Sequence, residues 1–167
     1  MILLFYSMRE LDFEQLMSVY EEGNIENGAR LYPDESAMAQ KQLAEQDFAD
    51  YLRHSFFCQK EAAYYVLADN SQYIAAARME PFEDGYLLSA LETRPGYRRN
   101  GYGMELVNNL VSAHSERGLL PIYSHVANTN IASINLHLQC GFRVHKDSAR
   151  YLDGSVRTDS RTFIYEK

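Results

Sequence analysis

Alternating apolar and polar positions predict a strand and two helices at the start of the chain. Residues 2–6 form a short apolar run that is typical of a strand. Ser7 and Glu10 have the spacing of a capping box, so we expect a helix to begin there and to end before Pro33. The next segment, residues 34–56, starts with capping residues and then repeats apolar positions at helical spacing, which predicts a second helix.

Three consecutive strands are predicted in the middle of the chain, over residues 62–68, 73–79 and 86–93, with turn residues between them. The apolar period then becomes that of a helix between Gly103 and Gly118, and glycine is suited to ending that helix. The remaining predicted elements are a strand at 122–126, a helix beginning at 128–130 and closed by Gly141, a strand from Arg150, and a final strand at 162–166. This order predicts a mixed α/β sheet with helices on both of its faces.

Length and composition narrow the class of protein. The 167 residues are 46% hydrophobic and 23% charged, which fits one globular domain spanning 1–167. Charged residues interrupt the apolar start too early for a signal peptide or a membrane span, so we expect no membrane association. Cys58 and Cys140 form no disulfide framework, and a reducing cytoplasm is the expected compartment.

The net charge of −7 argues against general nucleic-acid binding, but the charge is unevenly divided. Residues 1–90 hold 16 acidic and 6 basic side chains, whereas residues 91–167 hold 7 acidic and 10 basic side chains. This asymmetry is either a set of solvated faces, or a sign that the second half receives an anion and the first half faces a cation.

The segment 94–103 is the clearest candidate for a binding site. It lies between a predicted strand and a predicted helix, and Gly101 and Gly103 allow a tight turn that can aim several N–H groups at one point. Arg98 and Arg99 add positive charge beside the helix N-terminus, a combination that suits a pyrophosphate. Glycine spacing alone also fits a purely structural turn, but a dinucleotide fold is disfavoured because Leu106 replaces the third glycine of its fingerprint.

Two blocks of sequence resemble the GNAT acyltransferases. Arg98-x-x-Gly101-x-Gly103 is similar to the acyl-CoA-binding motif of that family, and the preceding Thr93-x-Pro95 resembles the end of its fourth strand. A second block has the spacing of the family's later helix, with Asn130, Ser133, His137 and Gly141-Phe142. The two blocks occur in the family's order, with a predicted strand between them.

The resemblance implies an α/β GNAT fold in which two parallel strands of a mixed sheet, 86–93 and 122–126, splay apart around acetyl-CoA as co-substrate. By this resemblance, the backbone of the first strand pairs with the pantetheine arm, the turn holds the pyrophosphate, and Asn130 fixes the arm near the thioester. The implied cofactor-binding residues are Leu91, Thr93, Arg98, Arg99, Asn100, Gly101, Tyr102, Gly103, Met104, Asn130 and Ser133.

Amine acetylation also needs a proton acceptor and gains from a proton donor near the departing sulfur. His137 stands where the family often has a tyrosine acid, and the alternative is a histidine packed in the helix. His125 stands where some members have a glutamate base, and the alternative is a strand histidine in the packing. Glu92 is the second candidate base, because strand alternation puts it opposite Leu91 and Thr93.

No metal site is expected, since His125, His137 and Cys140 lack carboxylate partners at ligand spacing. Cys140 precedes the helix-ending Gly141 at the negative end of the helix dipole, which favours a structural thiol over a nucleophile.

The resemblance therefore implies an N-acetyltransferase that moves acetyl from acetyl-CoA to a primary amine by direct attack in a ternary complex. Two alternatives stay open: a module that binds acyl-CoA without turnover, and a protein whose acidic face in residues 1–90 recruits a basic partner. The acceptor is a small molecule or a peptide, and the acidic first half favours a cationic amine. Homodimers are common in the family, but the sequence identifies no interface.

Overall fold

The computed structural model describes residues 1–166. The C-terminal segment considered in the sequence analysis ends at residue 167, which lies outside the described residues. The elements follow the chain as β1 (Ile2–Phe5), α1 (Phe13–Val19), α2 (Glu21–Leu31), α3 (Ala37–His54), the short 3-10 helix η1 (Phe56–Cys58), β2 (Ala63–Asp69), β3 (Gln72–Phe82), β4 (Gly85–Thr93), α4 (Tyr102–Glu116), β5 (Ile122–Ala127), α5 (Ile131–Gln139), β6 (Arg143–Lys146), β7 (Ala149–Arg150), β8 (Val156–Arg157) and β9 (Ser160–Tyr165).

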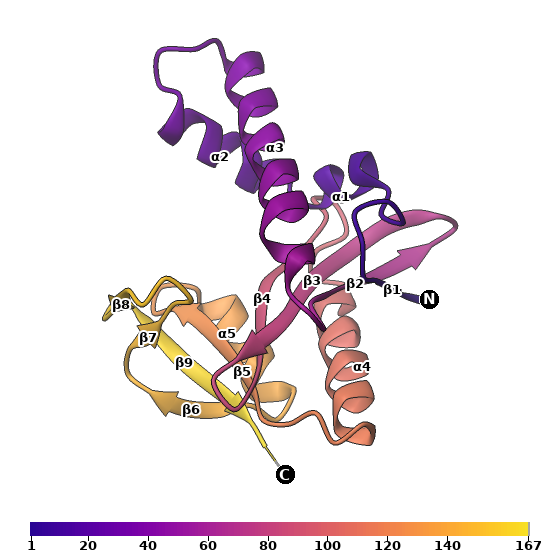
Figure 1. Cartoon of the computed structure of the whole chain (residues 1–167), viewed down its shortest axis with the longest axis vertical. Coiled ribbons are helices and arrows are strands. Elements are labelled where there is room, and N and C mark those ends of the chain that lie inside the picture. The colour runs from indigo at the N-terminus through magenta and orange to yellow at the C-terminus, as the bar shows by residue number, and fades with distance from the viewer. Residues whose placement is uncertain (167) are drawn as a thin grey trace.

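Seven strands form one mixed sheet in the order β1-β2-β3-β4-β5-β9-β6. Within residues 1–166, β4 and β5 run parallel and the other neighbouring strands run antiparallel. The parallel pairing extends only from Tyr86–Ile122 to Leu88–Ser124, although both strands continue beyond it. The two strands therefore separate, as Figure 1 shows near the middle of the molecule.

Helices cover both faces of the sheet, as the sequence predicts. Alternate residues of β2 divide between the two cores, with Tyr65 packing on the α4 side and Tyr64 on the α1–α3 side. The helix α4 buries Leu106 and Leu110 completely against the sheet, and Leu136 of α5 packs against the same core. The α1–α3 face and the α4–α5 face are thus two separate surfaces on which ligands can approach the diverging strands.

The first helical segment begins and divides differently from the prediction. Asp12, and not Ser7, is the N-cap of α1, and its carboxylate accepts a hydrogen bond from the Gln15 amide at 3.1 Å. The predicted helix is also interrupted at Tyr20, which ends α1 and precedes α2. Ser36 caps α3 as expected, with its hydroxyl accepting from the Ala39 amide at 3.3 Å.

The C-terminal region contains strands that the sequence does not reveal. The strand β6 is exposed along its whole length, so it lacks the apolar alternation on which the prediction depends. The strand expected from Arg150 is a two-residue segment, β7, which pairs with β8 in a separate two-stranded sheet. Within residues 1–166, no helix combines the length and the apolar character needed to cross a membrane.

Candidate functional site

A cavity of about 640 Å³ opens where β4 and β5 diverge. We call it the splay cavity, and its walls come from the end of β4, the loop that follows it, the start of α4 and one side of α5. Its volume is that of a site for a small molecule or cofactor. Ten of the eleven predicted cofactor-binding residues line it.

Asn100 is the exception, because its side-chain amide donates to the carbonyls of Tyr97 and Arg98 at 3.2 Å and braces the loop from within. The structure also adds lining residues that the motif does not include. The added residues are Tyr97, Ala132, Asn135, Leu136 and Gln139. The last four recur at helical spacing after Asn130, so the sequence could have predicted that they share one face of the helix with it.

The loop between β4 and α4 leaves backbone donors free for a ligand. Gly101 is the N-cap of α4 in the left-handed conformation, with φ of 84°, and it makes no side-chain cap. The first intrahelical bond runs from the Glu105 amide to the Gly101 carbonyl, so the amides of Tyr102, Gly103 and Met104 have no partner within the helix. An anion placed there meets three N–H groups and the positive end of the helix dipole.

Gly103 is needed for close packing rather than for an unusual φ. A Cβ built on it would lie 3.1 Å from Leu136 Cδ1 and 3.3 Å from Thr93 Oγ1, which is tighter than ordinary side-chain contact. The glycine therefore lets β4, α4 and α5 converge at the floor of the splay cavity.

Arg98 lines the splay cavity, but acidic neighbours already engage its guanidinium. Its Nη1 lies 2.5 Å from Glu22 Oε2 of α2, its Nη2 lies 3.2 Å from Glu92 Oε1, and its Nε donates to the Thr93 carbonyl at 3.1 Å. The charge predicted to hold a pyrophosphate is thus shared with two carboxylates in the structure.

Asn130 caps a helix as well as lining the splay cavity. Its Oδ1 accepts from the Ser133 amide at 3.0 Å, so it is the N-cap of α5. Its predicted role toward the cofactor arm stays a prediction.

His137 is on the buried side of α5 and does not line the splay cavity, since it is only 1% exposed. Its Nδ1 lies 2.8 Å from the Ser133 carbonyl, which can only accept, so Nδ1 carries the hydrogen. The other nitrogen, Nε2, is buried without a partner within residues 1–166, and the ring packs against Phe142 and Phe163. Burial lowers the pKa of His137, so the neutral ring has no ready proton at Nε2, and its predicted acid role stays untested.

His125 lies one residue past the last parallel pair, on the side of β5 that faces away from α4. Its Nε2 donates to the Arg150 carbonyl at 2.8 Å, and its Nδ1 lies 3.1 Å from Thr162 Oγ1, which lies 2.7 Å from the Ser148 carbonyl. The single hydroxyl hydrogen of Thr162 serves either the neutral Nδ1 or the Ser148 carbonyl. All three bonds coexist only when Nδ1 is protonated.

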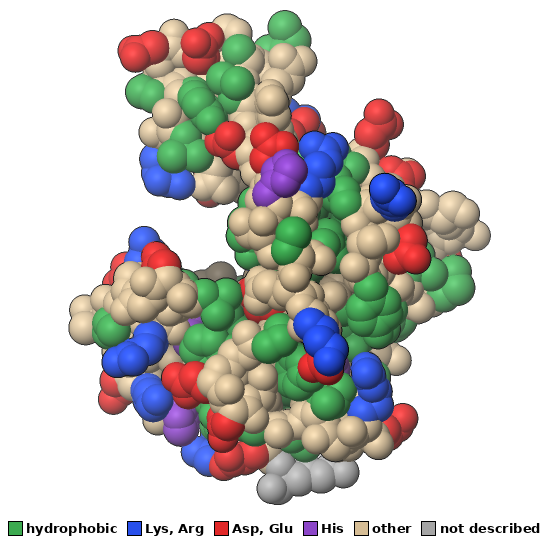
Figure 2. Space-filling view, in the orientation of Figure 1, with side chains coloured by type: hydrophobic (Ala, Val, Ile, Leu, Met, Phe, Trp, Pro, Cys, Tyr) green, Lys and Arg blue, Asp and Glu red, His purple; other side chains and the backbone are tan. Residues whose placement is uncertain are grey.

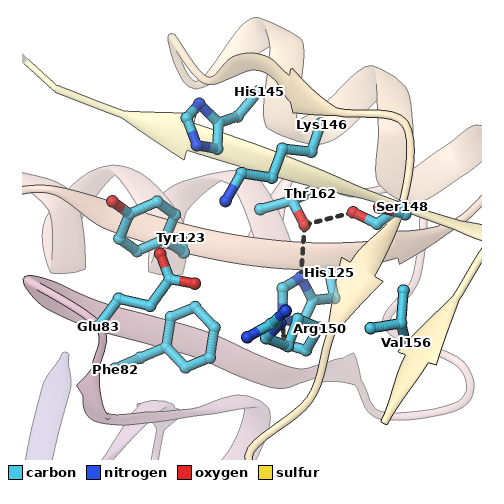
Figure 3. A pocket seen from close by; sticks show the side chains of 10 residues that line it. All are labelled: Phe82, Glu83, Tyr123, His125, His145, Lys146, Ser148, Arg150, Val156 and Thr162. Carbon is cyan, nitrogen blue, oxygen red and sulfur yellow. Dashed lines mark hydrogen bonds between the residues drawn. The ribbon is translucent and has the colours of Figure 1, made fainter. Parts of the chain in front are cut away.

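Burial lowers the pKa of His125, so the resting ring is neutral near pH 7 and its Nδ1 is able to accept a proton. The ring borders a cavity of about 340 Å³ between the β3–β4 turn and the segment around β7. Figure 3 shows His125 beside Arg150 and Thr162 in this cavity, with the dashed bonds that join Thr162 to its two neighbours.

Glu92 lines the splay cavity on its loop side. Its Oε1 accepts from the Thr93 amide at 3.0 Å as well as from Arg98. The structure thus brings Glu92 to the predicted cofactor-binding residues and places His125 on the opposite surface of the sheet.

A third hollow, which we call the α2–α3 cleft, has a volume of about 380 Å³ and lies on the α1–α3 face. Residues of α2, α3, β3 and β4 line it, including Ala90, which has φ of 49° where the β3–β4 register shifts. The Tyr20 hydroxyl donates to the Ala90 carbonyl at 2.6 Å and accepts from the Tyr64 hydroxyl at 3.0 Å. Figure 2 shows a notch between the α2–α3 end of the molecule and the lobe that contains β5 and β9.

The acidic excess of residues 1–90 does not line this cleft. Its charged lining residues are Arg30, Arg78 and Asp47, and the Asp47 carboxylate accepts from the Tyr32 hydroxyl at 2.5 Å. The charge of the segment is therefore a poor guide to the charge of the cleft.

Cys140 is buried and its thiol pKa is raised by burial, in keeping with a structural role. Within residues 1–166, no group of three His, Cys, Asp or Glu side chains is arranged to hold a metal ion.

A family model described as the acetyltransferase (GNAT) family matches residues 28–142. The chain therefore belongs to the GNAT acetyltransferase family, and its seven-stranded mixed sheet is the fold of that family. No curated protein matches the chain significantly.

Solved structures of similar fold cover nearly the whole chain. The PaiA N-acetyltransferase of Thermoplasma acidophilum, solved with coenzyme A, is 15% identical, with 100% of this chain and 99% of that chain covered and a TM-score of 0.68. The ribosomal-protein-S18-alanine N-acetyltransferase of Escherichia coli is 21% identical, with coverage of 98% and 92% and a TM-score of 0.62. An aminoglycoside 6'-acetyltransferase of type Ii is 16% identical, with coverage of 99% and 96% and a TM-score of 0.64. At these identities the likeness shows the fold alone.

Proposed function

We propose that this protein transfers an acetyl group from acetyl-CoA to a primary amine by direct attack in a ternary complex. The observation that carries the proposal is the splay cavity, because it gathers ten predicted cofactor residues where β4 and β5 part. Family membership supports an acyl-CoA-dependent N-acetyltransferase, and a similar structure holds coenzyme A.

The residues of the splay cavity fit coenzyme A in shape and charge. The uncapped amides of Tyr102, Gly103 and Met104 suit a pyrophosphate, and Gly103 leaves room where a side chain would narrow the cavity. The backbone of Leu91 and Thr93, past the last β4–β5 pair, suits the amide groups of the pantetheine arm. When bound, acetyl-CoA supplies a thioester carbonyl that an amine can attack.

The acceptor amine approaches from the α1–α3 face, where the α2–α3 cleft reaches Ala90. Its nitrogen must first lose a proton, since ammonium has no lone pair for attack. We assign that proton to His125 by way of Thr162: the Thr162 hydroxyl passes its own hydrogen to Nδ1, takes up the proton from the amine, and donates it to the Ser148 carbonyl. Glu92 is the second proposed acceptor, acting through water from the cofactor side. The new C–N bond forms as the C–S bond breaks, and coenzyme A leaves as a thiolate that takes up a proton.

The test combines binding with turnover. Calorimetry should show saturable binding of acetyl-CoA, and an assay for free coenzyme A should show release with at least one class in a panel of primary amines. Absence of saturable binding contradicts the proposal. Binding without release on any amine indicates instead a GNAT-fold module that holds acyl-CoA without turnover.

A further inference from the structure

We propose that the acetyl acceptor is a small amine that also carries a carboxylate, and that Arg78 binds this carboxylate in the α2–α3 cleft. The inference rests on the proposed acetyltransferase function and names the chemical class of its acceptor. It assigns to Arg78 a role that the sequence motifs do not indicate.

Arg78 lies beside the point of attack. It is on β3, opposite Ser89 of β4, and Ser89 directly precedes the bulged residue Ala90. Arg78 and Ala90 both line the α2–α3 cleft, on the surface from which the amine approaches. A group bound by Arg78 is therefore close to the acceptor nitrogen.

Three aromatic rings fix the guanidinium of Arg78. Its Cζ lies 4.9 Å from the ring centroid of Tyr51, 5.6 Å from that of Phe56 and 6.0 Å from that of Phe48. The negative faces of these rings attract the cation and hold it in the wall of the α2–α3 cleft. Within residues 1–166, Arg78 forms no ion pair and no side-chain hydrogen bond, and its Nε is buried without a partner.

Burial of the Arg78 Nε without a partner is costly, and a ligand oxygen bonded to the guanidinium would offset that cost. The nearest acidic residue on the same face of β3 is Glu80, whose carboxylate accepts from Gln59 Nε2 at 2.8 Å and from Ser89 Oγ at 3.5 Å. Glu80 therefore has its own donors and forms no ion pair with Arg78. A planar carboxylate from the ligand matches the paired N–H groups of arginine.

The charge of the cleft supports the same class of acceptor. Arg30 joins Arg78 in the lining against the single carboxylate of Asp47, so the charged residues that line the cleft sum to 2 − 1 = +1. A second ammonium on the substrate would be repelled there, which disfavours polyamines. The same repulsion lowers the pKa of the reacting ammonium and increases its neutral, nucleophilic fraction.

The decisive comparison is between amino acids and their amides. Each pair, such as alanine and alaninamide, keeps the amine and replaces the carboxylate by a neutral group. We expect at least one amino acid to be acetylated with kcat/KM at least 10-fold above its amide, and spermidine to be a poorer acceptor. In Arg78→Gln this preference should disappear, with kcat/KM for the amino acid falling about 10- to 100-fold and that for the amide changing little, as for the loss of a hydrogen bond to a charged group.

Two controls separate binding from folding. Arg53→Gln makes the same charge change on the exposed side of α3, outside the cleft, and should leave the preference intact. Calorimetry of the N-acetylated amino acid should show binding to the wild type and to Arg78→Lys more strongly than to Arg78→Gln, without need of turnover. Equal rates on amino acids and amides, a preference for spermidine, or an equal loss on both substrates in Arg78→Gln would overturn the assignment. Failure of every amine despite acetyl-CoA binding would instead remove the proposed function on which it rests.

Discussion

Glu22 in the first turn of α2 and Arg98 in the β4–α4 loop form an ion pair, with Oε2 and Nη1 2.5 Å apart across 76 residues of sequence. Arg98 also pairs with Glu92 of β4. The pair joins a helix that lines the α2–α3 cleft to the loop that lines the splay cavity. The Glu22 carboxylate thus competes with a ligand phosphate for Arg98, which the sequence motif predicts to bind that phosphate.

Replacing Glu22 should release Arg98 for the phosphates of coenzyme A. We expect Glu22→Gln to increase the affinity for coenzyme A by about two- to fivefold, the range of a partly exposed ion pair. Calorimetry at low salt measures the effect, and the gain should shrink as ionic strength rises. Glu21→Gln is the matched control, because Glu21 pairs with Lys41 of α3 and not with the loop. A loss of affinity in Glu22→Gln would show that the pair holds Arg98 in its binding position.

Gly101 should matter for ligand binding beyond its effect on folding. Gly101 and Gly154 have similar φ angles, 84° and 82°, and open space where a Cβ would lie. Gly101→Ala and Gly154→Ala should each destabilise the fold by about 1–2 kcal/mol through backbone strain. Only Gly101→Ala should weaken coenzyme A binding, by about 10-fold or more, because it disturbs the amides that begin α4. Thermal unfolding and calorimetry on the two variants distinguish these effects, and equal coenzyme A affinities would contradict the assigned role.

The Tyr20 hydroxyl should position the backbone at the point of attack. Tyr20→Phe removes the donor to the Ala90 carbonyl and leaves the Tyr64 hydroxyl without its acceptor. We expect a loss of about 1–3 kcal/mol in unfolding free energy. We also expect a fall in kcat of at least fivefold, with the KM for acetyl-CoA nearly unchanged.

Tyr73→Phe is the matched control for Tyr20→Phe. The Tyr73 hydroxyl accepts from the Asp12 amide on the same face of the sheet, away from Ala90. This variant should lose stability and keep its kcat. If kcat falls equally in both variants, Tyr20 has no special influence on the reaction.

His137 should affect stability in acid more than catalysis. Burial lowers its pKa in the folded protein below the ordinary value of about 6.5, so the unfolded chain binds more protons as the pH falls through that value. The free energy of unfolding should therefore decrease with falling pH below about pH 6.5. His137→Gln should flatten this decrease, and denaturant titrations between pH 5 and 8 measure it.

The pH–rate profile tests independently whether His137 takes part in catalysis. We expect an unshifted profile for His137→Gln, because the wild-type ring lies outside the splay cavity. The exposed His54 offers a control, since His54→Gln should change neither measurement. A profile that loses its acidic or basic limb in His137→Gln would restore the predicted acid role.

The glycine-rich loop was predictable because its chemistry depends on local sequence. Gly101 needs a left-handed φ and Gly103 needs the absence of a Cβ, and both demands are visible as residue types at fixed spacing. The helix beginning at 128–130 was predictable for a similar reason, since residues suited to capping precede an apolar stripe, whereas the role of Asn130 toward a cofactor comes from the family resemblance. Local geometry of this kind leaves a direct trace in the chain.

Contacts between distant segments leave no such trace. Tyr20 ends α1, and its hydroxyl donates a hydrogen bond to the carbonyl of Ala90, 70 residues further along the chain. Neither residue type predicts this bond. The capping spacing of Ser7 and Glu10 was misleading, because the apolar residues that pack on the sheet begin a helix only after Asp12. Likewise, the acidic excess of the first half does not reveal that Arg78 lies in the cleft among aromatic rings.

The short parallel pairing of β4 with β5 has a mechanical consequence. Only three residue pairs, from Tyr86–Ile122 to Leu88–Ser124, connect these two strands in the middle of the sheet. The strands β1 to β4 on one side and β5, β9 and β6 on the other are each continuously bonded, so these three pairs are the seam between two halves of the sheet. A ligand arm that bonded along the open edge of β4, as proposed, would supply hydrogen bonds that β5 does not make there and so would connect the two halves of the sheet beyond Leu88.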